Sequence, residues 1–134
     1  MVGVVTNGGE QAAVEYLVNK DATPENLVLR LFKNDITPAE ADVVGGYTEA
    51  TFTGYAAVTL TGASWTITPG SIPQASYAEQ AFTSSADQTA QIIYGYYITR
   101  ATAADLVAAE RFTTPPTIQF NGDSIELTPV IKVS

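Results

Sequence analysis

Cysteine and histidine are both absent from this 134-residue sequence. Without them the chain has no thiol or imidazole nucleophile, and it cannot form a disulfide bond. Zinc, haem and iron–sulfur sites that are built on these two residue types are excluded for the same reason. The side chains left for catalysis are those of serine, threonine, tyrosine, lysine, aspartate and glutamate.

Basic residues are scarce. Six lysines and arginines stand against fourteen aspartates and glutamates, which gives a net charge of −8 at pH 7 and an isoelectric point near 4.2. Such an acidic chain is repelled by nucleic acid and by anionic membrane surfaces. We therefore expect neither a nucleic-acid partner nor a membrane partner.

Long hydrophobic runs are also missing, since no segment approaches the roughly 20 apolar residues that cross a bilayer. Residues 1–7 lack the basic start and the long apolar stretch of a secretory signal, so we expect no export signal. The hydrophobic fraction of 46% nevertheless provides enough material for a core, which excludes disorder of the whole chain. The length predicts a single domain over residues 1–134.

One segment near the N-terminus has the pattern of an amphipathic helix, which we predict over residues 8–19. Asn7 and Glu10 are typical of a capping pair, and Pro24 prevents any continuation. The apolar residues expected on its packed face are Ala12, Ala13, Tyr16 and Leu17. Before this helix, residues 1–6 form a short apolar arm with Val2, Val4 and Val5. Two interpretations of it stay open, a frayed terminus or a strand that pairs with a partner chain.

From Leu27 onward apolar residues recur with a period of two, which indicates β-strands. We expect about eight strands, at residues 27–32, 55–61, 65–68, 77–83, 90–99, 106–112, 117–120 and 124–128. Asn121–Asp123 predicts a hairpin turn between the last two, and Pro129 predicts an edge position or a bulge for the final strand. The fold class is therefore mainly β, an antiparallel β-sandwich or jelly-roll-like domain with one short N-terminal α-helix.

The strand predicted at residues 90–99 is apolar on both faces, so it lies centrally in a sandwich or partly in an interface. We interpret the surplus apolar surface as a sign of homo-oligomerisation, with a trimer preferred. The candidate interface residues are Val2, Val4, Val5, Tyr94, Tyr96 and Tyr97. The alternative is a monomer in which the helix and loops cover this strand.

Few residues are arranged for chemistry. Glu110 is in phase with Leu106 and Phe112, so it points inward, where we expect an arginine (Arg30, Arg100 or Arg111) to pair with it. No second carboxylate completes a glycosidase pair. The acidic residues Asp35, Glu40 and Asp42 lack the spacing of a calcium loop, and a solvated loop over residues 39–46 is the better interpretation. We therefore predict no catalytic residues, no metal ligands and no cofactor.

Several segments together resemble a known group of proteins. They are Leu27–Pro38, Tyr47–Tyr55, Ile92–Thr99, Ala109–Phe112 and Gly122–Pro129. In this order they are similar to small structural proteins of tailed bacteriophages, over most of the span from Asn7 to Pro129. The resemblance implies a virion component made in the host cytoplasm.

The first choice within that group is a non-enzymatic capsid cement or decoration protein on the capsid exterior, with the major capsid protein and copies of itself as partners. The second choice is a tail or fibre module. The resemblance carries over no functional residues, because such proteins act through whole surfaces. A carbohydrate- or receptor-binding module and an enzyme stay open as other classes.

Overall fold

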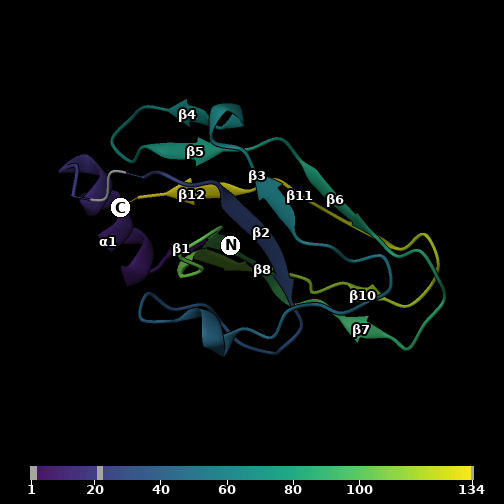
Figure 1. Ribbon diagram of the computed structural model, residues 1–134. Coiled ribbons are helices and arrows are strands. Elements are labelled where there is room, and N and C mark those ends of the chain that lie inside the picture. Colours follow the sequence, from purple (N-terminus) through teal and green to yellow (C-terminus); the bar gives the residue numbers. More distant parts are fainter. Residues whose placement is uncertain (1–2, 21–22, 134) are drawn as a thin grey trace.

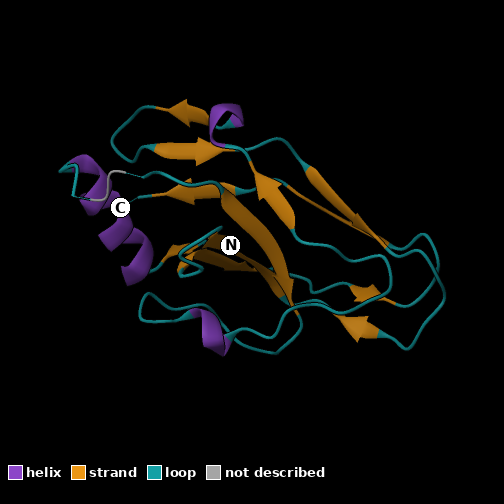
Figure 2. Ribbon diagram, in the orientation of Figure 1, coloured by secondary structure: helices purple, strands orange, loops and turns teal. Residues whose placement is uncertain are grey.

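The computed structural model describes residues 3–20 and 23–133, and it is mainly β (Figures 1 and 2). Within these residues there are one α-helix, two short 3-10 helices and twelve short strands. All paired strands are antiparallel, as in a β-sandwich-like domain. The predicted fold class is therefore confirmed. No helix in the described part of the chain is long and apolar enough to cross a membrane.

One layer is a five-stranded sheet with the order β1-β9-β8-β2-β3. Its strands are β1 (Val4–Val5), β2 (Leu27–Phe32), β3 (Val58–Leu60), β8 (Gly95–Arg100) and β9 (Leu106–Arg111). The alternation in β2 turns Leu29 and Leu31 into the core, where both are fully buried. β8 is the central strand, as its apolar sequence predicts.

The facing layer is made by two chain segments that run antiparallel along their whole length. The first contains β5 (Gln74–Ser76) and β6 (Gln80–Thr83), and the second contains β11 (Ser124–Leu127) and β12 (Val130–Lys132). Three residues separate β5 from β6, but only two separate β11 from β12. The extra residue lies on the segment that contains β5 and β6, opposite Pro129, and not on the strand for which an edge position or a bulge was predicted. Strand β4 (Thr66–Thr68) is added outside β5.

The core lies between the two layers. It contains Leu29, Leu31, Tyr96 and Ile98 from the five-stranded sheet, and Phe82, Ile125 and Leu127 from the facing layer. A third pair of strands, β7 (Gln91–Ile92) with β10 (Thr117–Ile118), closes the end on the right of Figure 1. The short 3-10 helices are η1 (Val44–Gly46) and η2 (Gly62–Ser64).

The outer face of β8 is covered as well. Phe32, Tyr47 and Tyr97 form an aromatic cluster there, with Tyr47 lying 5.1 Å from each of the other two rings. Tyr47 comes from the loop that follows β2, so this loop acts as a lid over the sheet (Figure 1). The alternative of a central strand covered by loops is therefore what the fold contains.

Several strand predictions are wrong, and residues 55–61 form a strand only over Val58–Leu60. The segment 90–99 forms two strands, β7 and β8, which belong to different sheets. The segment 77–83 is a strand only from Gln80, and β5 precedes it, where no strand was predicted. Residues 117–120 and 124–128 are joined by a turn, with Gly122 at a φ of 92°, but they do not pair with each other. They pair with β7 and β6, because that arrangement buries Ile118 and Ile125 in the core.

Candidate functional site

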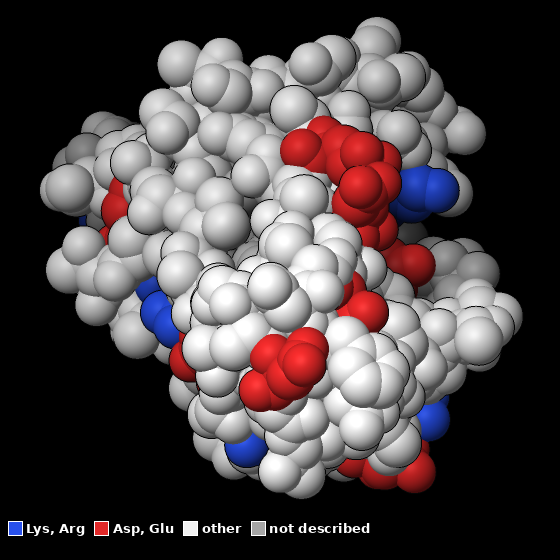
Figure 3. Space-filling model, turned by 90° about the vertical axis from the view of Figure 1, so that its right-hand side faces the viewer, with Lys and Arg blue, Asp and Glu red and all other residues white. Residues whose placement is uncertain are grey.

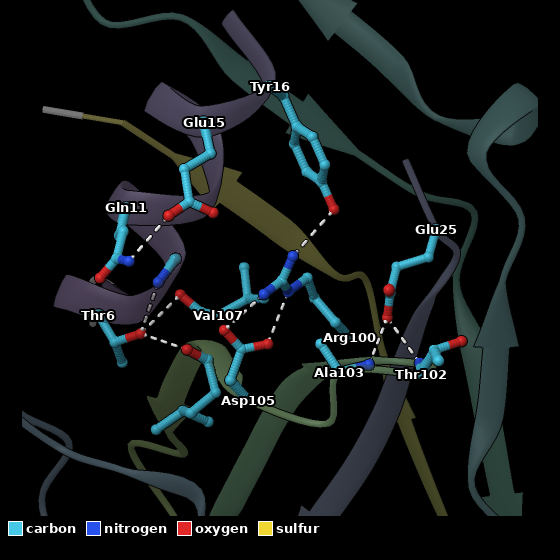
Figure 4. A network of polar contacts seen from close by, with 12 residues as sticks. Thr6, Gln11, Glu15, Tyr16, Glu25, Arg100, Thr102, Ala103, Asp105 and Val107 are labelled. Atoms are coloured by element: carbon cyan, nitrogen blue, oxygen red, sulfur yellow. Dashed lines mark hydrogen bonds and ion pairs between the residues drawn. The ribbon is translucent and has the colours of Figure 1, made fainter. Parts of the chain in front are cut away.

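The helix α1 (Asn7–Leu17) begins at Thr6, which is fully buried. The Thr6 hydroxyl donates to the carbonyl of Leu106 at 2.6 Å and accepts from the backbone N–H of Gly9 at 3.2 Å (Figure 4). One side chain thus caps the helix and ties it to β9. The prediction that Asn7 caps the helix is wrong, and the predicted range of 8–19 shifts toward the N-terminus.

Small residues bring α1 close to the sheet. A side chain on Gly9 would overlap the backbone carbonyl of Val107, so only glycine permits this approach. Two turns later the Tyr16 hydroxyl accepts from Arg100 at 3.2 Å, and Arg100 also makes a bidentate ion pair with Asp105. Figure 4 shows this network beneath the helix. It fixes which face of α1 is turned toward the sheet.

The opposite face of α1 is apolar and open to solvent. Val14, Leu17 and Val18 are 58%, 84% and 64% exposed, and their spacing places them on one side of the helix. We call these three residues the α1 stripe. The prediction that Ala13 and Leu17 belong to the packed face is wrong, since both are exposed. The helix has two apolar faces. The face with the smaller side chains packs against the sheet, because small side chains allow a closer contact between helix and sheet.

Beside the helix lies a small apolar hollow of about 160 Å³. Its walls come from α1, from the start of β2 and from the C-terminal strand, and they include Ala13, Tyr16, Leu27, Ile131 and Val133. Since Val133 is exposed too, unsatisfied apolar surface continues from the helix toward the end of the chain. This end of the molecule is the best candidate for contact with a partner.

Two of the three tyrosines predicted as interface anchors are core residues instead. Tyr96 and Tyr97 are each only 3% exposed, one in the main core and the other under the loop that follows β2. Burial is the main cause that raises the pKa of Tyr97 to about 12. Tyr94 is half-buried, with the guanidinium carbon of Arg111 at 5.1 Å from its ring centre. The prediction is therefore wrong for Tyr96 and Tyr97.

The N-terminal arm pairs within its own chain. Val4 and Val5 form β1, which lies opposite Ala109 and Ala108 of β9. The interpretation as a strand is right, but its partner is not a second chain. Both side chains are half-buried, and β1 completes one edge of the five-stranded sheet. Val2, also a candidate interface residue, lies outside the described residues.

Glu110 lines a hollow of about 280 Å³ near this arm, together with Gly3, Gln74, Tyr96 and Lys132. Its carboxylate accepts a hydrogen bond of 2.7 Å from the Tyr96 hydroxyl. The prediction that an arginine pairs with Glu110 is wrong. The three arginines form ion pairs with other carboxylates: Arg30 with Glu49, Arg100 with Asp105, and Arg111 with Asp35. Glu110 is the one carboxylate among the residues that line this hollow, whereas glycoside hydrolysis uses two.

The acidic loop residues serve the fold. Asp35 pairs with Arg111 at 2.7 Å, and Asp42 accepts from the Tyr47 hydroxyl at 2.8 Å and from the backbone N–H of Ala39 at 2.9 Å. Among the described residues, no group of three or more aspartates and glutamates is placed to hold a metal ion. Asp42 therefore helps to hold the loop over the aromatic cluster.

The outer surface is acidic. All three arginines are engaged in ion pairs, so lysines supply the remaining positive charge against a larger number of carboxylates. Figure 3 shows separate groups of carboxylates on one end of the molecule, with few basic groups between wide uncharged areas. No protein-family model, curated protein or solved structure matches this chain.

Proposed function

We propose that this protein is a non-enzymatic structural component of a tailed-phage virion, a capsid cement or decoration protein that binds the outside of the shell. The observation that carries the proposal is the α1 stripe. Its three aliphatic side chains are exposed to solvent, while hydrogen bonds of Thr6 and Tyr16 attach the opposite side of the helix to the sheet. The resemblance to phage structural proteins supplies the kind of assembly. A tail or fibre module is the second candidate within it.

The partner of the α1 stripe is a subunit of the major capsid protein with an apolar recess. Fully burying one valine or leucine side chain contributes about 1.5–3 kcal/mol. Three such side chains therefore contribute about 5 kcal/mol or more. The loss of translational and rotational freedom on association offsets a large part of this free energy. Because little net free energy is left, a single copy binds the capsid weakly. Several copies acting together on a symmetric shell would hold firmly.

An exterior position fits the charge. A net charge of −8 is unfavourable next to packaged DNA, whereas on the outside of a particle it favours solubility. The preference for a trimer loses its physical basis, because Tyr96, Tyr97 and the Val4–Val5 strand are satisfied within one chain. Contacts between copies need a different surface.

The test is co-sedimentation of the purified protein with capsids of the phage whose genome encodes it. We expect wild type to bind, and Leu17→Ser to lower the affinity about tenfold or more, since the most exposed residue of the stripe is removed. Val43→Ser is the matched control, because Val43 is 69% exposed on the loop that follows β2 and does not belong to the α1 stripe. Lack of binding by wild type, or equal binding by Leu17→Ser, would contradict the proposal. Binding on a glycan array would favour a carbohydrate-binding module instead.

A further inference from the structure

Strand β4 is an open edge. It is the last strand in the order β12-β5-β4, so one of its sides pairs with β5 and the other side has no strand partner in the part of the chain described. All three residues, Thr66, Ile67 and Thr68, are exposed, and Ile67 reaches 65%. In Figure 1 this strand lies at the upper margin of the molecule.

The edge is unusual because it lacks charge. Residues 50–78 contain none of the six basic and fourteen acidic residues of the chain, and β4 lies in the middle of this segment. Natural proteins commonly place charged side chains on exposed edge strands to prevent pairing with other chains. The top of the molecule in Figure 3 likewise carries no acidic or basic group on the face drawn.

The edge is also rigid. The 3-10 helix η2 precedes it and is fixed by the backbone N–H of Gly62, which donates to the Asn26 side chain at 3.1 Å. The Trp65 ring packs edge-on against Tyr77 at 5.2 Å, and the Tyr77 hydroxyl accepts from the backbone N–H of Thr61 at 3.2 Å. Little conformational freedom is therefore lost when a second strand is added.

We propose that β4 is a self-association site, at which two copies of this chain pair antiparallel across a two-fold axis to form a continuous six-stranded sheet. Two chains that each carry a charge of −8 repel, and the uncharged segment 50–78 is where they approach at least electrostatic cost. A two-fold axis at Ile67 brings this residue opposite itself and Thr66 opposite Thr68 of the second copy. Both pairs suit a strand, because β-branched side chains pack well across antiparallel neighbours.

The pairing is finite and weak. Pro69 directly follows β4 and ends it after three residues, so the added ladder is short and cannot extend into a fibre. A contact of this size falls below the area of a stable dimer. The dimer therefore forms at high protein concentration, or where copies are held close together. The site does not depend on the role proposed for the α1 stripe.

The experiment is sedimentation velocity of the full chain at concentrations from about 10 µM to about 1 mM, the range in which small interfaces associate. We expect wild type to change from monomer to dimer over this range. Ile67→Lys should raise the dissociation constant about tenfold or more, because the axis brings two like charges together. Val43→Lys is the matched control, since it makes the same change at an aliphatic side chain that is 69% exposed and lies outside both β4 and the α1 stripe, so it should leave association unchanged.

A mixing experiment tests the two-fold axis itself. Ile67→Lys and Ile67→Glu should each dimerise poorly, whereas an equimolar mixture of the two should associate more tightly than either alone. Circular dichroism of each variant confirms that the fold is kept, which is expected since residue 67 is exposed. The proposal is overturned if wild type stays monomeric throughout, if Ile67→Lys weakens association no more than Val43→Lys, or if the mixture associates no more tightly than either variant alone.

Discussion

Replacing Gly95 by alanine gives a stability change whose sign depends on the packing of the five-stranded sheet. Gly95 begins the central strand β8, and its φ does not lie in the left-handed region. In open space this substitution stabilises a strand by about 0.5–1 kcal/mol, because alanine has less freedom to lose in the unfolded chain. A purely local argument therefore predicts a more stable protein.

The packing around Gly95 makes the same substitution destabilising. A Cβ at Gly95 would overlap the backbone carbonyl oxygen of Glu110 and lie 2.6 Å from Cε1 of Phe32. Neither neighbour moves freely, since the carbonyl belongs to β9 and the Phe32 ring is fully buried against Tyr47 and Tyr97. Overpacking of a core costs about 1–3 kcal/mol and sometimes more. We expect a net loss of about 2 kcal/mol, which lowers the folded-to-unfolded ratio about 30-fold.

The assay is urea denaturation followed by circular dichroism, with Gly70→Ala as the matched control. A side chain at Gly70 would meet nothing within 4 Å, so that variant should be as stable as wild type or slightly more stable. A loss of about 2 kcal/mol also lowers the melting temperature of Gly95→Ala by about 6 °C at this chain length. If Gly95→Ala were as stable as the control, the close approach of β8 and β9 would be refuted.

Two further predictions concern the buried polar groups. Thr6→Ala should destabilise the protein by about 2 kcal/mol, because the helix cap and the hydrogen bond to the Leu106 carbonyl are both lost. Thr6→Ser keeps the hydroxyl and should keep most of the stability. Equal urea midpoints for the two variants would contradict this prediction. Burial raises the pKa of Tyr97 to about 12, above the value near 10 of an unfolded tyrosine. The folded state therefore holds the phenolic proton more tightly, so stability is complete below about pH 10 and falls as the pH rises toward 12. Tyrosinate absorbance at 295 nm should increase together with loss of the fold, and ionisation of all tyrosines near pH 10 with the fold intact would contradict it.

Much of the fold follows from local pattern. The alternation in residues 27–32 and 106–112 was enough to place β2 and β9. These predictions succeed because the period of two decides which side chains can be buried. The strand break within residues 90–99 was missed, since the residues from Ile92 to Ile98 other than Gly95 are all apolar or aromatic and no proline or charge separates them. Their different partners are set by contacts far away in the sequence.

The candidate site was harder to predict. Tyr96 and Tyr97 were assigned to an interface because both faces of their strand are apolar, and no local signal identifies Tyr47 as the residue that covers one face. The α1 stripe was missed because the helix has two apolar faces. Gly9 was the available clue, since a glycine on one face allows the closest approach to a sheet.

Electron cryomicroscopy of the virion to which we propose that this chain belongs tests the proposed function most directly. We predict density for the protein on the exterior of the capsid, with the Val14, Leu17 and Val18 side chains buried against a capsid subunit. Density confined to the tail or to the inside of the shell would contradict the proposal. So would a particle in which the protein sits on the capsid with the α1 stripe facing solvent.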